Sequence, residues 1–134
     1  MIDKHIIDTH SLIWYLEGSL KLGKNAKIVM DIKIANLVLP VIALAEAFDI
    51  VQKQRTSIPD TAILINRIFS DPRFEIEPLT LDVLLESQNA LIVPEMHDRL
   101  ITTTALSLKK QGFQVAVLTK APEIIASKLV EIIW

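Results

Sequence analysis

Three acidic residues stand beside apolar segments of this chain, where an ionised side chain needs a partner. Asp8 ends the apolar run HIID, Glu46 lies within ALAEAF, and Asp98 begins DRLITTTALSL. Burying a bare charge is costly, so each carboxylate must be hydrated, paired or bound to a metal. Carboxylates that converge raise each other's pKa unless a divalent cation offsets their charge. Oxygen ligands without Cys or His suit Mg²⁺ or Mn²⁺, and such an ion can activate water for phosphodiester hydrolysis.

The local sequence leaves two interpretations open for Glu46 and two for Asp98. On a helix, Glu46 shares a face with Ala43 and Ile50, which turns it towards the core, but a glutamate at a helix edge also reaches solvent. An acid such as Asp98 suits the positive end of a helix dipole, yet the apolar residues after it make its helix a core element. We expect the three acids to meet at the carboxyl end of a sheet, close enough to share one cation directly or through its waters.

The composition predicts one compact domain spanning residues 1–134. Hydrophobic residues make up 51% of the chain and charged residues 22%, which excludes a disordered protein. Cysteine is absent, so disulfides and thiolate sites are excluded and a reducing cytoplasm is expected. No apolar run approaches the roughly 18 residues of a membrane span, and the N-terminus lacks a signal-peptide pattern. The net charge of −2 gives no sign of a nucleic-acid partner, although a bound cation can reverse a local field.

Short apolar runs alternate with longer segments of helical period, which predicts βα units and a parallel sheet. We expect strands over residues 5–8, 37–40, 74–77, 115–119 and 130–133. We expect helices over residues 12–17, 25–33, 43–53, 81–91 and 98–110, and a further helix that starts at 57–60. Ser57 and Thr80 are the expected caps, and Gly112 the expected stop of the last helix. Parallel sheets bind ligands outside the carboxyl ends of their strands, which is where Asp8 stands.

With these acids and elements in place, the chain resembles a PIN domain, and within that family the small VapC-type ribonuclease toxins. IIDTHSLIWYL resembles the first strand and helix, LPVIALAEAF the second strand and its helix, and HDRLITTTAL the segment of the third acid. VAVLTKAPEII resembles the fourth strand and its turn, and EIIW the last short strand. Each motif is only moderately specific, but together and in this order they cover essentially the whole chain.

The resemblance implies an α/β fold, a PIN-like three-layer α/β/α sandwich around a short parallel sheet of about five strands. It implies an endoribonuclease that hydrolyses RNA phosphodiester bonds with Mg²⁺ or Mn²⁺. Asp8, Glu46 and Asp98 are then both the catalytic residues and the metal ligands, with Thr9, Thr119 and Glu123 as auxiliary candidates. Proteins of this type usually form homodimers and are held inactive by a small antitoxin whose C-terminal segment fills the active-site groove.

The chain departs from the family at one position. The family commonly has another aspartate after the fourth strand, two residues beyond a Ser or Thr. Here Thr119 matches the hydroxyl, but Ala121 occupies the aspartate position. Glu123 is the nearest replacement, although Pro122 constrains the turn. The alternative function is therefore a catalytically weakened or inactive PIN-like module that binds RNA or protein, and we expect weak metal binding with Mn²⁺ favoured.

Several other residues flank the acids, and a structural role is open for each. His10 and His97 are candidates for metal ligation or hydrogen bonding, and Arg99 for contact with phosphate or with an acid such as Glu95. Trp14 is expected in the core or a dimer interface. His10 also counts against phosphatase chemistry of the haloacid-dehalogenase kind, which needs a second aspartate at that position. A basic rim or the helix dipoles could explain four lysines, Lys109, Lys110, Lys120 and Lys128.

Overall fold

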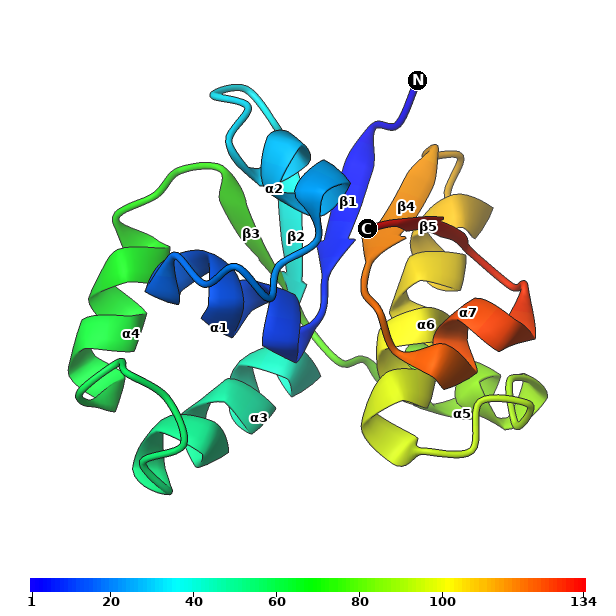
Figure 1. Cartoon of the computed structure of the whole chain (residues 1–134). Helices are drawn as coiled ribbons and strands as arrows, with labels where there is room; N and C mark the ends of the chain where they lie inside the picture. Colours follow the sequence, from blue (N-terminus) through cyan, green and yellow to red (C-terminus); the bar gives the residue numbers. More distant parts are fainter.

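The computed structural model describes all of residues 1–134 and has an α/β fold built on one sheet of five strands. The strands are β1 (Lys4–Ile7), β2 (Leu37–Pro40), β3 (Phe74–Glu77), β4 (Val115–Leu118) and β5 (Glu131–Ile133). Their order across the sheet is β3-β2-β1-β4-β5, and every neighbouring pair is parallel (Figure 1). The predicted α/β architecture with a short parallel sheet is confirmed.

Helices cover both halves of this sheet. They are α1 (Thr9–Glu17), α2 (Lys24–Met30), α3 (Val41–Gln52), α4 (Thr61–Phe69), α5 (Leu81–Glu86), α6 (Met96–Lys110) and α7 (Pro122–Ser127). In Figure 1, α1 to α4 lie on the side of β2 and β3, and α5 to α7 on the side of β4 and β5. The two groups meet where α3 packs against α6. None of these helices has the length and apolar character needed to cross a membrane.

The central strands are aliphatic and buried, as helices on both faces of a parallel sheet require. All four residues of β2 are buried, and Ile6 of β1 stands between Val38 of β2 and Val117 of β4 with no exposed surface on any of them. The hydrophobic core continues into the inner faces of α1, α3 and α6. Burial of both faces explains why β2 and β4 are uninterrupted apolar runs, LVLP and VAVL.

The strand order reverses between β1 and β4, which places a crevice beyond the carboxyl ends of these two strands. The chain adds β2 and β3 on one side of β1, and then crosses to the other side for β4 and β5. Ligands of such sheets bind at the carboxyl ends of the strands where the order reverses. In Figure 1 β1 and β4 run downward, so this point lies below them, where the chain turns into α1 and α7.

Capping side chains explain where the helices begin. Asp8 caps α1, so this helix starts at Thr9, three residues earlier than predicted. The prediction of Ser57 as the cap of α4 is wrong: Asp60 accepts the N–H of Ile63 at 2.9 Å. Thr80 caps α5 as predicted, because its side chain accepts the N–H three residues on.

The second half of the chain differs from the predicted elements in three places. Helix α5 ends at Glu86, and a short 3₁₀ turn, η1 (Ser87–Asn89), takes the place of its predicted last residues. Helix α6 begins at Met96 because Glu95 caps it. Helix α7 was not predicted, although Pro122 at its first turn is a typical helix start. Gly112 follows α6 with a φ of +103°, which confirms the glycine stop.

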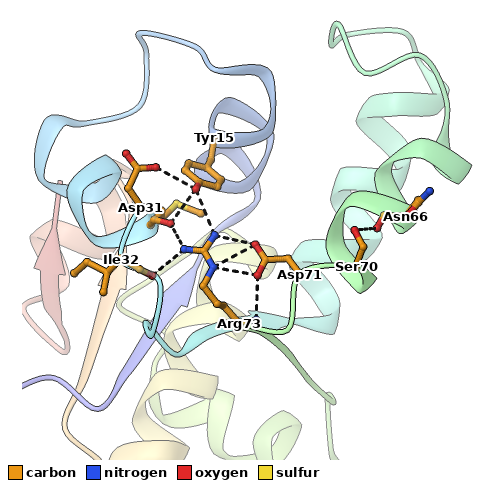
Figure 2. Close-up of polar contacts among 8 residues, drawn as sticks. Tyr15, Asp31, Ile32, Asn66, Ser70, Asp71 and Arg73 are labelled. Atoms are coloured by element: carbon orange, nitrogen blue, oxygen red, sulfur yellow. Dashed lines mark hydrogen bonds and ion pairs between the residues drawn. The ribbon is translucent and has the colours of Figure 1, made fainter.

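The amino end of the sheet is held by a cluster that we call the Arg73 clamp, drawn in Figure 2: Arg73, Asp71, Tyr15, Asp31, Met30 and Ile32. The Arg73 guanidinium donates to Asp71 Oδ2 at 2.8 Å and to the Ile32 carbonyl at 2.9 Å, and also to the Met30 carbonyl. The Tyr15 hydroxyl donates to that same Met30 carbonyl at 2.9 Å. The hydrogen bond from Arg73 lowers the pKa of Asp71. The clamp therefore joins α1, the end of α2 and the start of β3.

Candidate active site

Asp8 leaves the sheet at the end of β1 and caps α1. Its carboxylate Oδ1 accepts the N–H of Ser11 at 2.8 Å, and its second oxygen makes no hydrogen bond to the protein. The Ser11 hydroxyl donates to the Leu118 carbonyl at 2.8 Å, which fastens the start of α1 to the end of β4. Asp8 is only 7% exposed. The positive end of α1 offsets part of the cost of burying this carboxylate and fixes its position.

Glu46 projects from α3 towards the start of α1. The Thr9 hydroxyl donates to Glu46 Oε1 at 2.6 Å. Thr9 is itself 2% exposed, so this hydrogen bond links α1 and α3 inside the structure. This contact supports the interpretation in which Glu46 faces inward. Thr9, a predicted auxiliary residue, orients the Glu46 carboxylate.

Asp98 lies in the first turn of α6, and Glu95 caps that helix. The Asp98 N–H donates to Glu95 Oε2 at 2.7 Å, while Glu95 Oε1 pairs with His97 Nδ1 at 2.7 Å. The backbone N–H of Glu95 in turn donates to Glu123 Oε2 at 3.3 Å. The acids that begin α6 and α7 are therefore neighbours, although 28 residues separate Glu95 from Glu123 in the sequence.

One pocket brings the three predicted acids together at the carboxyl edge of the sheet. Asp8, Glu46 and Asp98 all line a cavity of about 560 Å³, a size typical of ligand sites. A fourth acid, Glu95, lines it as well. The rest of the lining comprises Thr9, His10, Trp14, Lys21, Ile101, Lys120, Ala121 and Trp134. The four acids come from three separate segments, since Glu95 and Asp98 both stand at the start of α6, so the fold rather than the local sequence brings the segments together.

The pocket acids repel one another, and this repulsion helps to raise the pKa of Asp98. Burial, together with the nearby carboxylates of Glu95, Asp8, Glu46 and Glu123, raises the pKa of Asp98 to about 6. Burial also acts to raise the pKa of Glu95, but hydrogen bonds from the Asp98 N–H and from His97 bring it below its ordinary value. Hydrogen bonds thus stabilise the ionised form of Glu95, whereas burial and the neighbouring acids all disfavour the ionised form of Asp98.

The donor set of this pocket fits a hard divalent cation. Four carboxylates and two ammonium groups, Lys21 and Lys120, line it, so the fully ionised lining carries two net negative charges. One divalent cation would balance that charge. No three of the Asp, Glu and His side chains stand close enough together to hold a metal ion between them. Mg²⁺ usually keeps several waters and takes only one or two carboxylates, so the arrangement suits a partly hydrated ion.

The turn after β4 also reaches the pocket. Ala121, where the resemblance expects an aspartate, lines the pocket and starts α7 without a side-chain cap. Thr119 is fully buried and does not line the pocket: its hydroxyl accepts the N–H of Ala121 at 3.0 Å and so shapes the turn. Glu123 does not line the pocket either, and its carboxylate contacts the Glu95 backbone instead.

The histidines and Arg99 have mainly structural contacts. His10 lines the pocket and lies against Trp14, with ring centroids 5.4 Å apart. The hydrogen bond with Glu95 raises the pKa of His97. Arg99 donates to the backbone carbonyls of residues 93 and 94 at 2.8 and 2.7 Å, so it fixes the loop before α6 and does not pair with Glu95.

Three pocket residues were not anticipated from the sequence: Glu95, Lys21 and Trp134. Glutamate is an uncommon N-cap, so EMHD gave no strong capping signal. Lys21 lies in the loop after α1, and Trp134 follows β5. Of the four lysines considered as a basic rim, only Lys120 lines the pocket. Only the folded sheet, which sets β5 beside β4, brings Trp134 to this edge.

Comparison with known proteins supports the fold. No protein-family model matches the sequence, and no curated protein matches it. The chain superposes on a chain from the crystal structure of VapBC2 from Rickettsia felis bound to a DNA fragment from their promoter, with a TM-score of 0.67 and 14% sequence identity. The superposition covers 96% of each chain. At this identity the likeness speaks for the fold alone, and it supports a VapC-like PIN fold for this chain.

Proposed function

We propose that this chain is a metal-dependent endoribonuclease of the VapC toxin type, which hydrolyses RNA phosphodiester bonds with Mg²⁺ or Mn²⁺. The main support is that Asp8, Glu46 and Asp98, from three separate segments, line one pocket at the point where the strand order reverses. The pKa of Asp98, raised to about 6 by burial and by the neighbouring carboxylates, is typical of acids that share a site without a counter-ion.

Each acid has a distinct part in this proposal. A bound cation would supply an activated water and a positive charge beside the scissile phosphate. One or two of Asp8, Glu46 and Asp98 would bind the cation directly, and the others would hold it through its waters. The Ser11 N–H fixes one oxygen of Asp8 and leaves the other for the ion, and Thr9 does the same for Glu46. Glu95 would act as a positioning residue, because it caps the helix turn that carries Asp98.

The proposal includes a homodimer and a small antitoxin as partners. Six apolar side chains in α5 and in the segment from its end to the start of α6, which we call the α5 face, are each 47–68% exposed: Leu81, Leu84, Leu85, Leu91, Ile92 and Met96. Exposed apolar patches of this kind are typical of interaction sites. The Rickettsia felis relative in fold is itself a VapBC2 assembly. Light scattering should therefore detect self-association, and a monomer at high micromolar concentration would count against the dimer.

A specific observation favours a second candidate function, a PIN-like module that binds RNA or protein without cleaving it. Ala121 lines the pocket at the place of the expected aspartate and offers no ligand. Fewer anionic ligands hold Mg²⁺ less well, and this ion dehydrates reluctantly. We therefore expect weak metal binding with Mn²⁺ favoured over Mg²⁺, and slow or absent cleavage.

Cleavage of RNA with Mn²⁺, with Mg²⁺ and with a chelator separates the two candidates. Asp8→Asn and Glu46→Gln should each lower cleavage about 100-fold or more, in the range for loss of a group that activates the nucleophile. Asp49→Asn is the matched control, because Asp49 lies on the same helix as Glu46 and pairs with Lys53 on the exposed surface. Full activity of Asp8→Asn would exclude a metal-centred mechanism in this pocket. RNA binding without cleavage under every cation would favour the binding module.

A further inference from the structure

Two tryptophans form an aromatic wall in the pocket that also holds the acids. Trp14 of α1 and Trp134 after β5 both line the pocket, with ring centroids 6.0 Å apart and ring planes at 63°. The His10 ring also lies near this pair, with its centroid 5.4 Å from that of Trp14. Tryptophan occurs only twice in the chain, so both indoles stand in this one cavity.

Trp134 is held in place from the side of α2. A Cβ atom on Gly23 would lie 2.6–2.7 Å from the backbone and indole of Trp134, so only glycine permits this close approach. The side-chain amide of Asn25 donates to the Trp134 carbonyl at 2.8 Å. The wall is therefore built before any ligand arrives, which lowers the entropic cost of binding.

Two cations, Lys21 and Lys120, line the pocket with this wall and make no salt bridge. Lys120 Nζ lies 4.8 Å from the centroid of the Trp14 ring. Neither Lys120 nor Lys21 makes a salt bridge, although four carboxylates line the same pocket. Both lysines are exposed, so their ammonium groups can turn to an incoming anion. Aromatic faces beside free lysines are the usual equipment for holding a base and its phosphate.

We propose that Trp14, Trp134 and Lys120 hold one unpaired nucleobase and its phosphate, so that the neighbouring phosphodiester bond of a single strand reaches the acids. This inference rests on the proposed function and specifies its substrate as single-stranded RNA or the loop of a folded RNA. A base inside a duplex is stacked on both faces and cannot offer one to an indole, whereas an unpaired base can. Every base has an aromatic face, so this contact selects for unpaired nucleotides and tolerates different sequences.

Quenching of tryptophan fluorescence tests the wall directly, because both indoles of the chain belong to it. The titrations use Ca²⁺, an oxygen-ligated cation that balances the charge of the acids, and gel analysis afterwards checks that the oligonucleotides remain intact. The ligands are a short unstructured RNA, the same RNA paired in a duplex, an abasic version of equal charge, and the DNA of the same sequence. We expect saturable quenching by the unpaired RNA and at least a five-fold weaker response to the duplex and to the abasic strand.

Single substitutions separate stacking from charge. Trp134→Leu should weaken binding of the unpaired RNA about five-fold or more, the lower end for one base on an aromatic ring, while Trp134→Phe should keep most of the affinity. Lys120→Gln should lower the slope of log affinity against log salt by about 0.7, as expected when one contact to a single-strand phosphate is lost. Lys33→Gln is the control, since Lys33 is exposed, lies before β2 at the opposite edge, and changes the charge equally.

The outcomes distinguish this inference from the proposed function. Quenching that is equal for the duplex, the abasic strand and the unpaired RNA would overturn the base contact, even if the enzyme cleaves RNA. Quenching by DNA alone would overturn the assignment to RNA. Selective quenching by unpaired RNA would support the inference even if no cation yields cleavage. The proposed nuclease activity would then be rejected, and the proposed contact between a base and the two tryptophans would be kept.

Discussion

The pKa of an aspartate is shifted in opposite directions at the two edges of the sheet. At the amino edge, the Arg73 guanidinium binds Asp71 through both oxygens and lowers its pKa. At the carboxyl edge, burial and a group of other carboxylates raise the pKa of Asp98 to about 6. The chain thus pairs Asp71 with a cation at the amino edge, whereas the two lysines that line the pocket at the carboxyl edge make no salt bridge with its acids. The fully ionised lining of the pocket keeps two net negative charges after its two lysines are counted, and this excess is the physical basis for assigning it a cation.

Helix α1 connects these two regions. Its first turn is capped by Asp8 at the pocket, and near its last turn the Tyr15 hydroxyl reaches the Arg73 clamp. The clamp can therefore position the pocket without taking part in its chemistry. Perturbations at the clamp should change stability, and perturbations at the pocket should change metal binding.

The largest expected effect on stability is at the clamp. Arg73→Met leaves Asp71 without its partner and removes the donor from the Met30 and Ile32 carbonyls. Loss of one member of a partly buried pair and its hydrogen bonds should lower the free energy of unfolding by about 2–4 kcal/mol. Urea denaturation at pH 7 measures this.

Lys53→Met is the matched control for that substitution, because Lys53 pairs with Asp49 on an exposed helix surface. Its effect should stay within about 0.5 kcal/mol. An equal loss for both variants would mean that the clamp is no more than an ordinary surface pair.

The next largest effects on the free energy of unfolding should come from Asp71→Asn and Asp98→Asn, and they should have opposite signs. At pH 7 and without metal, Asp71→Asn should destabilise the fold by about 1–2 kcal/mol, and Asp98→Asn should stabilise it by about 1–2 kcal/mol. The pKa of Asp98 rises from 3.8 to about 6, which corresponds to roughly 3 kcal/mol before a discount for partial solvation. Denaturation curves of both variants and the natural protein give the comparison.

The pH dependence should separate the two aspartates as well. The penalty from Asp98 should be absent below about pH 4, grow as the pH rises towards 6, and be complete above 6, because its folded-state pKa is raised. The contribution of Asp71 should be present above about pH 4 and disappear as the pH falls through its lowered pKa. Parallel curves for the natural protein and Asp98→Asn between pH 4 and 7 would contradict the repulsion in the pocket.

The sequence predicted the sheet well and the helix ends less well. Strands β2 and β3 match their predicted bounds. Strand β2 is an uninterrupted apolar run, which is distinctive in a parallel sheet, and β3, FEIE, alternates apolar and acidic residues as a strand with one packed face does. Helix starts depend on which polar side chain bends back to the backbone, and both Ser57 and Asp60 were chemically able to cap α4. The structure decides for Asp60, while Ser57 donates to Glu17 of α1.

The smallest expected change in stability concerns Ala121. Aspartate at this position would cap α7, which contributes about 1 kcal/mol, but it would add another charge to the acidic pocket, so the two effects should nearly cancel. Ala121→Asp should nevertheless bind Mn²⁺ about ten-fold more tightly and speed any RNA cleavage. Isothermal titration with Mn²⁺ and the cleavage assay measure these changes.

Glu123→Gln is the companion of that substitution. It should change Mn²⁺ affinity little, because Glu123 does not line the pocket and contacts the Glu95 backbone. A large loss of affinity in Glu123→Gln would make Glu123 the fourth ligand. No response to either substitution would place the cation away from the turn after β4.

The sequence identified part of the pocket and missed the rest for a physical reason. Asp8 could be recognised because an acid at the end of a buried strand is conspicuous. Glu95 could not, since its importance depends on a backbone turn that sets its carboxylate beside Asp98. Trp134 reaches the pocket only because β5 pairs with β4 and Gly23 leaves room for the indole. A local sequence pattern can reveal a charged residue whose burial is costly, such as Asp8. Contacts between distant segments can be identified only once the fold is known.

Thermal melting of the natural protein and Asp98→Asn, with a chelator and then with Mn²⁺, tests the central claim most directly. With the chelator, the variant should melt at the higher temperature, because it removes the least compensated carboxylate from the pocket. Mn²⁺ should raise the melting temperature of the natural protein, since a cation that binds only the folded state stabilises it, and should raise that of the variant much less. If the two proteins melt together with the chelator and respond equally to Mn²⁺, the pocket is not the cation site.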